Sequence, residues 1–287
     1  MIPTPTPPLR IQAAALSRGG LELWRGLDLE VAPGELVAVL GPSGAGKTTL
    51  LRAILGLERL TAGTIETFGE RVQRAGNRRI GYIPQQRPLP RHTAMRGRDL
   101  VRLGVDGHRF GLPLSRRADR ARVDALIDAV GARAFADRPV GLLSGGEQQR
   151  LRVGQALADD PGLLLCDEPL TSLDLANQRD VIDLIDRYRM RSGAGVLLVT
   201  HDINPVLEKV DRILYLTGGR FTLGRPDDVL TSETLSGLYG TPVHVARVGG
   251  RLVVVGAPDS HAEEHHHGAD AVSLEASASG AQGGARR

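Results

Sequence analysis

The chain has 287 residues, 41% of them hydrophobic, a formal net charge of +3 and one cysteine, Cys166. This length and apolar content predict a globular protein of one or two domains, and a single cysteine excludes an internal disulfide. No apolar run approaches the ~20 residues that a membrane-spanning helix needs. The Pro-rich start MIPTPTPPLR lacks the pattern of a secretory signal, and the single cysteine is compatible with a reducing cytosol.

The first motif lies between an expected strand at residues 35–40 and an expected helix at residues 49–56. Its spacing, G-x-x-x-x-G-K-T, is typical of a phosphate-binding loop, in which backbone N–H groups and a helix N-terminus bind a polyphosphate. Lys47 is one of only two lysines beside 34 arginines, and its compact ammonium suits the β- and γ-phosphates better than a planar guanidinium. The motif therefore predicts a nucleotide site at Gly41, Ser43, Gly44, Ala45, Gly46, Lys47, Thr48 and Thr49.

Residues 71–122 are strongly basic, with fourteen arginines against the acidic residues Asp99, Asp106 and Asp119. A nucleic-acid surface is one interpretation. However, the stretch holds only two aromatic residues, Tyr82 and Phe110, and matches no nucleic-acid-binding module. We favour an arginine-rich surface that faces solvent or lipid headgroups, and we expect no nucleic-acid partner.

A helix start is expected at Ser144, where the hydroxyl is a suitable N-cap, Glu147 is its capping-box partner and apolar residues follow at helical spacing. The adjacent Gly145 and Gly146 weaken a helix but allow the backbone to approach a ligand closely. We therefore expect a second phosphate-binding segment at Ser144, Gly145 and Gly146.

Two later strands are each expected to end in polar residues. Residues 162–167 form an apolar run that ends at Asp167, and ligands bind at the carboxyl ends of parallel strands. Asp167 is expected to hold Mg²⁺, with the Thr48 hydroxyl as a direct ligand. The next residue, Glu168, is placed to orient or deprotonate the water that attacks a γ-phosphate. Residues 195–199 form the other strand, and His201 follows it.

The order of these motifs resembles that of ATP-binding cassette (ABC) proteins over roughly residues 10–225. The resemblance implies an α/β fold, with a P-loop NTPase core of RecA type (a mixed sheet flanked by helices), an antiparallel β subdomain and an inserted helical subdomain. It implies that Gln85 contacts Mg²⁺ and the attacking water, and that His201 contacts the γ-phosphate. It also places Asp174, in Ser172-Leu-Asp174, in a loop that passes signals across a dimer.

The same resemblance implies ATP hydrolysis by a head-to-tail dimer of two identical subunits. Each ATP would lie between the phosphate loop of one copy and Ser144, Gly145 and Gly146 of the other. The translocation path would belong to integral-membrane permease subunits, which dock on the helical subdomain and the Gln85 loop. We expect the chain at the cytoplasmic face of the cell membrane, with an extracytoplasmic solute-binding protein in the same system.

By this resemblance, residues 1–85 and 160–225 form the nucleotide-binding core with its β subdomain. Residues 86–159 form the helical subdomain, and residues 226–257 a small C-terminal extension. Residues 258–287 contain few sizeable apolar side chains and are expected to be disordered. This tail holds four of the eight histidines, at residues 261–267. Weak binding of zinc or nickel and drift in an unconstrained polar tail both remain open.

The segments Thr200-His-Asp-Ile-Asn-Pro-Val-Leu and Gly81-Tyr-Ile-Pro-Gln look most similar to ATPases of the metal-cation uptake group, which serves zinc, manganese or iron. An organic-solute importer or an exporter is the alternative. A non-transport ABC ATPase of translation or DNA repair is disfavoured. Such proteins usually carry two cassettes or a long coiled-coil insertion, whereas only 58 residues separate Gln85 from Ser144.

One position departs from the family pattern. An aromatic residue ahead of the phosphate loop commonly stacks on adenine in ABC proteins, and the matching residue here is Arg18. Trp24 lies in a strand-like stretch, so we expect it to pack in a core or at an edge. The guanidinium of Arg18 is then the group expected to stack on the base.

Overall fold

The computed structural model describes residues 6–74, 76–85, 89–107 and 117–256. Its central sheet has six strands in the order β10-β9-β3-β8-β7-β6, and all but the edge strand β10 run parallel. The strands are β3 (Leu36–Leu40), β6 (Ile80–Ile83), β7 (Leu163–Asp167), β8 (Gly195–Val199), β9 (Arg212–Thr217) and β10 (Arg220–Gly224). The parallel arrangement brings the carboxyl ends of β3, β6, β7 and β8 to one edge, where ligand sites form in α/β sheets.

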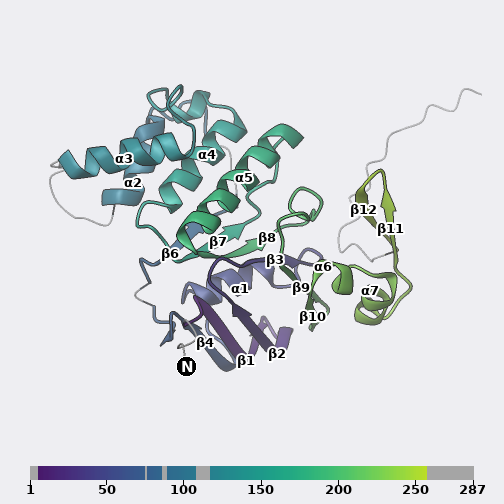
Figure 1. The fold of residues 1–287 in the computed structure, drawn as a ribbon. Coiled ribbons are helices and arrows are strands. Elements are labelled where there is room, and N and C mark those ends of the chain that lie inside the picture. The colour runs from purple at the N-terminus through teal and green to yellow at the C-terminus, as the bar shows by residue number, and fades with distance from the viewer. Residues whose placement is uncertain (1–5, 75, 86–88, 108–116, 257–287) are drawn as a thin grey trace, which may run out of the picture.

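A second sheet is antiparallel and has the order β2-β1-β4-β5. Its strands are β1 (Leu9–Arg18), β2 (Leu21–Val31), β4 (Ala62–Thr67) and β5 (Glu70–Arg71). Helix α1 (Lys47–Ile54) lies between the two sheets, and α5 (Leu175–Ser192) covers the opposite face of the central sheet (Figure 1). The expected α/β fold class, with its mixed P-loop sheet and antiparallel sheet, is confirmed.

Every residue of β3, β7 and β8 is buried because this sheet is covered on both faces. Alternate side chains of a strand point to opposite faces. On β3, Leu36 and Ala38 therefore join the core beneath α5, whereas Val37 and Val39 join the core between the two sheets. Trp24 belongs to this second core and is 0% exposed, so the expectation of core packing is confirmed.

Three helices lie together at one end of the central sheet, next to β6 (Figure 1). They are α2 (Gly97–Asp106), α3 (Arg117–Ala129) and α4 (Gly145–Ala156), and the 3₁₀ turn η1 (Val140–Leu142) precedes α4. A Cβ atom at Gly104 would lie 2.3 Å from the Gln155 carbonyl oxygen, so the glycine allows α2 and α4 to pack closely. All three helices fall within residues 86–159, and the domain boundaries stay a prediction.

The last described elements are α6 (Pro226–Val229), α7 (Ser232–Tyr239) and the hairpin of β11 (His244–Val248) and β12 (Arg251–Val255). Helices α6 and α7 lie beside β9 and β10 at the other end of the sheet, and the hairpin lies further out, beyond these helices (Figure 1). Leu235, Val243 and Leu252 join the core beneath α5, and the Tyr239 hydroxyl lies 2.9 Å from that of Tyr215 on β9. The expected disordered tail and its histidines at 261–267 lie outside the described residues.

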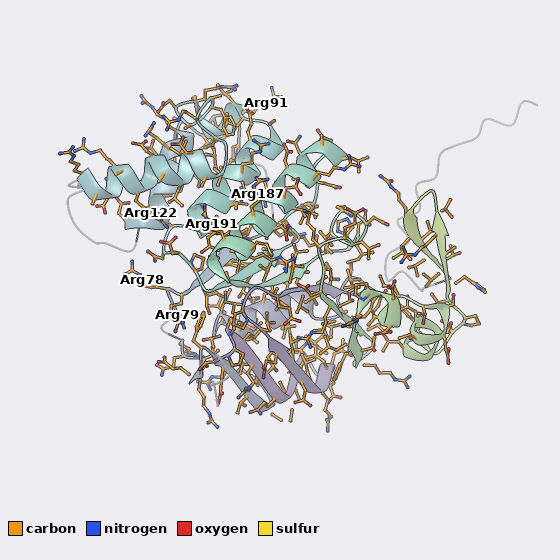
Figure 2. The ribbon with its side chains drawn as sticks, viewed as in Figure 1. Arg78, Arg79, Arg91, Arg122, Arg187 and Arg191 are labelled. Atoms are coloured by element: carbon orange, nitrogen blue, oxygen red, sulfur yellow. The ribbon has the colours of Figure 1, made fainter. Side chains whose placement is uncertain are left out.

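Several arginines of the basic stretch lie along one edge of the molecule, where Figure 2 labels Arg78, Arg79 and Arg122. Acidic residues from outside the stretch neutralise part of their charge. Arg78 pairs with Asp159 at 3.1 Å and Arg122 with Asp160 at 2.6 Å. Such ion pairs are typical of a solvated surface.

Candidate nucleotide-binding and hydrolysis site

Residues 41–46 connect β3 to α1 through three glycines with positive φ: Gly41, Gly44 and Gly46. Gly41 has φ +139°, and a Cβ there would lie 1.9 Å from the Leu216 carbonyl oxygen. Gly46, the N-cap of α1, has φ +90°, and a Cβ would meet the Trp24 indole nitrogen at 3.0 Å. Because α1 begins directly after this loop, the N–H groups and positive dipole end of the helix N-terminus suit the loop to anion binding.

The other expected loop residues line the same turn. Ser43 and Gly44 are exposed at its tip, whereas Ala45 and Thr49 are buried. Lys47 is only 7% exposed, and its ammonium donates to the carbonyl oxygens of Gly41 at 2.6 Å and Pro42 at 2.8 Å. Burial lowers the pKa of Lys47, and the nearby carboxylates Glu168 and Asp167 oppose that shift. A cation held within the loop in this way can exchange carbonyl oxygens for phosphate oxygens.

Thr48 and Asp167 lie side by side at the edge of the sheet. The Thr48 hydroxyl donates to one carboxylate oxygen of Asp167 at 3.0 Å, and the Tyr82 hydroxyl donates to the other at 3.3 Å. Asp167 is 2% exposed, and burial is the main cause that raises its pKa. Burial and the neighbouring Asp167 raise the pKa of Tyr82 to about 12, so this phenol stays a hydrogen-bond donor.

A hydroxyl beside a carboxylate is a suitable donor pair for Mg²⁺, which usually takes one or two protein oxygens and completes its shell with water and substrate phosphates. Among the described residues, no cluster of three or more His, Cys, Asp or Glu side chains could hold a metal by itself. The residues present therefore fit a magnesium ion that arrives with a nucleotide. Sequence reasoning missed the contact of Tyr82 with Asp167, which arises because β6 and β7 are neighbours in the sheet.

Gln85, Glu168 and His201 come from the carboxyl ends of β6, β7 and β8, and the structure brings them together. One Glu168 carboxylate oxygen accepts from the Gln85 amide at 3.0 Å and from the Thr171 hydroxyl at 3.1 Å, and it lies 3.7 Å from Nδ1 of His201. The nearby imidazole of His201 is the main cause that lowers the pKa of Glu168, and the carboxylate of Glu168 in turn raises the pKa of His201.

The backbone at Glu168 is strained, because φ is +47° in a residue that carries a side chain. Such conformations cost about 1–3 kcal/mol and cluster at functional sites. The lowered pKa keeps Glu168 ionised at neutral pH. An ionised carboxylate one residue after Asp167 can therefore accept a proton from water next to a bound phosphate.

Ser144 and Asp174 begin two neighbouring helices. Ser144 caps α4 with Glu147 in the expected capping box, and Asp174 caps α5 by accepting from the Asn177 backbone at 2.8 Å. A Cβ at Gly146 would lie 2.1 Å from the Asn177 side-chain oxygen. The contact with Asn177 therefore explains why residue 146 is a glycine, which the sequence did not reveal. Ser144 and Gly145 are exposed.

Arg18 ends β1 opposite Leu21 and is exposed, whereas Trp24 lies buried beneath the loop at Gly46. A buried indole cannot stack on a base. Arg18 therefore remains the residue expected to contact adenine.

Arg18→Ala is expected to weaken ATP binding about two- to fivefold, the size of an exposed cation–π contact, and to leave the hydrolysis rate at saturating ATP unchanged. Titration with a fluorescent ATP analogue measures the affinity. Arg25→Ala, on the adjacent strand and paired with Glu22, is the matched control. Equal affinities for the wild type and Arg18→Ala would contradict the prediction.

Comparison with known proteins identifies the family. The ABC transporter family matches residues 24–171, from Trp24 through the phosphate loop to Thr171. The chain belongs to the ABC transporter family. This ABC ATPase hydrolyses ATP as the ATPase subunit of a transporter. Among its described residues, no helix has the length and apolar character needed to cross a membrane.

The ABC ATPase is 34% identical to the zinc import ATP-binding protein ZnuC of Paramagnetospirillum magneticum, over 91% of this chain and 90% of that protein. It is 39% identical to the phosphonates import ATP-binding protein PhnC of Anaeromyxobacter dehalogenans, over 83% of this chain but 49% of that protein. In structure it resembles an ABC transporter described as metal-chelate type and inward-facing, with a TM-score of 0.72, 28% identity and coverage of 86% and 96% of the two chains.

Proposed function

We propose that the chain is the ATPase subunit of a metal-cation importer, with zinc as the first candidate cargo. The observation that carries this proposal is the similarity to a zinc import ATPase along nearly the whole length of both chains. The similarity to the phosphonate import ATPase is higher in identity but spans about half of that protein. An organic-solute importer therefore stays the second candidate.

The geometry supports separate roles for these residues in ATP hydrolysis. Residues 41–46 and Lys47 hold the phosphates of ATP, and Thr48, Asp167 and Gln85 hold Mg²⁺, which neutralises the charge of the transferred group. Glu168 orients the attacking water and takes its proton, while His201 contacts the γ-phosphate. These roles rest on the contact of Thr48 with Asp167 and on the contacts of Glu168 with Gln85 and His201.

Ser144, Gly145 and Gly146 face the ATP of a second copy, and Asp174 lies in the same interface. The support for this arrangement is that the N-termini of α4 and α5, which carry these residues, pack against each other through Gly146 and Asn177. Two helix N-termini presented together suit contact with an anionic ligand. Permease subunits would hold the dimer at the cytoplasmic face of the membrane, and a solute-binding protein would deliver the cargo.

Cells that carry Glu168→Gln in place of the wild-type gene are expected to show a selective fall in total zinc, with manganese and iron unchanged. Elemental analysis of washed cells measures all three metals. Glu70→Gln, on the exposed strand β5, is the control and should retain wild-type zinc. A fall in manganese or iron alone would make that metal, and not zinc, the candidate cargo. No change in any metal, with the protein still in the membrane fraction, would favour an organic solute or an exporter.

A further inference from the structure

His201 lies in a tight turn that follows β8. The Thr200 hydroxyl donates to the Asp202 carbonyl oxygen at 2.8 Å and accepts from the Asp202 N–H at 3.2 Å. One Asp202 carboxylate oxygen accepts from both the backbone N–H and the side-chain amide of Asn204, each at 2.9 Å. The His201 side chain itself is 62% exposed. The position of its imidazole therefore depends on the backbone of this turn rather than on packing of the ring.

Asn204 joins the turn to the C-terminal hairpin. Its side-chain oxygen accepts from the Leu252 N–H at 2.8 Å, and its side-chain nitrogen donates to the Leu252 carbonyl oxygen at 3.0 Å. This pair of bonds matches both backbone groups of one residue on β12, as a neighbouring strand would. The turn that carries His201 is thus anchored to a residue 48 positions further along the chain.

The hairpin residue that Asn204 contacts is itself held in place. Leu252 is buried in the core beneath α5, and the Val245 N–H on β11 donates to the Ser232 hydroxyl of α7 at 2.9 Å. Ser236 of α7 holds Val243, just before β11, through its hydroxyl. Movement of Leu252 would therefore disturb both the core and the contacts with α7.

On another side the turn borders a cavity of about 430 Å³ rather than packed side chains. Asp202 and Asn204 line it together with the hairpin tip, Gly249 and Gly250, and with Leu175 near the start of α5. Close packing normally fixes a loop in place. The buried side chain of Ile203 holds the turn from the core side, and the two bonds to Leu252 hold it beside this open space.

We propose that Asn204 is a positioning residue for hydrolysis, which holds His201 within reach of Glu168 and the γ-phosphate by clamping its turn to the β11–β12 hairpin. This inference rests on the proposed contact of His201 with the γ-phosphate. It gives Leu252 of the C-terminal hairpin a part in holding the turn that carries His201. Loss of the clamp should affect the step that involves the γ-phosphate and spare the binding of ADP, which lacks that group.

Asn204→Ala in the full chain tests the proposal. We expect kcat for ATP hydrolysis to fall on the order of tenfold, because small displacements of a catalytic group cost rate steeply, while the affinity for ADP stays at the wild-type value. Arg247→Ala is the matched control. It breaks the exposed pair of β11 with Asp227 but leaves the contact between the turn and Leu252 intact, and it should keep the wild-type kcat.

A double-mutant cycle with His201→Ala separates positioning from loss of stability. If Asn204 acts through His201, Asn204→Ala should lower kcat no further in the His201→Ala background. An equal loss in both backgrounds, or a wild-type kcat for Asn204→Ala alone, would overturn the proposal. A wild-type kcat for His201→Ala would instead refute the assigned role of His201, and the positioning role with it. The assignment to metal import is tested separately by cellular zinc.

Discussion

Glu168→Gln is expected to lower the rate of ATP hydrolysis by about 10²–10⁴-fold, the usual contribution of a general base, while ATP binding is retained. Glutamine has the same shape, so the contacts with Gln85 and Thr171 can form again, but its neutral amide cannot accept a proton from water. In the wild type the neighbouring His201 holds the pKa of Glu168 below its ordinary value. The base is therefore present at neutral pH and is lost only as the pH falls through that lowered pKa.

Steady-state assays at saturating ATP measure the rate of hydrolysis. Equilibrium binding to the same preparation measures the affinity for ATP. Glu70→Gln, an exposed glutamate on β5, should behave as the wild type in both assays. A rate for Glu168→Gln within a few-fold of the wild type would show that Glu168 is not the general base. A parallel loss of ATP binding would show that the substitution damages the site as a whole.

Arg189→Ala is expected to lower the free energy of unfolding by about 3 kcal/mol, near the lower end for breaking a buried ion pair, since one of its acidic partners is half exposed. Arg189 is 8% exposed, and its guanidinium makes four contacts of 2.7–2.9 Å with Asp186, Asp211 and the carbonyl oxygens of Gly34 and Lys209. These contacts tie the end of α5 to the segments that enter β3 and β9. Removal of the side chain leaves all four partners without this donor.

Urea unfolding gives the free energy, and the thermal midpoint should fall by roughly 6–12 °C for a chain of this size. Arg191→Ala, an exposed arginine two residues further on α5 (Figure 2), is the matched control and should change stability by less than about 0.5 kcal/mol. Equal stability of the two variants would show that the contacts of Arg189 contribute little to the native state.

The sequence was most informative about features that depend on residues close to one another in the chain. Gly41, Gly46 and Lys47 indicate the phosphate loop, because few residues tolerate its positive φ angles and because the motif spans eight consecutive positions. The apolar runs that become β7 and β8, and the capping box at Ser144, also depend on neighbours along the chain. These features were enough to predict the fold class and the family, and both are confirmed.

Other features depend on which distant segments meet. No sequence pattern indicated that Tyr82 would contact Asp167, that Asn177 would occupy the space beside Gly146, or that Arg189 would bridge three segments. The clamp between Asn204 and Leu252 joins residues 48 positions apart. Hydrogen bonds of this kind leave no periodic pattern in a sequence, because each partner is an ordinary polar or backbone group until the fold brings it near the other.

By itself, then, the sequence determined the chemistry at the ends of the central strands: the loop for phosphates, the carboxylates Asp167 and Glu168, and the histidine that follows β8. Only the tertiary structure decided how these groups are held. Tyr82 on the neighbouring strand contacts Asp167, and the C-terminal hairpin contacts the turn that carries His201. The physical reason is that residue type and local spacing encode backbone conformation and the presence of a reactive group. The position of that group to within an ångström depends on packing and hydrogen bonds between segments that are remote in the chain.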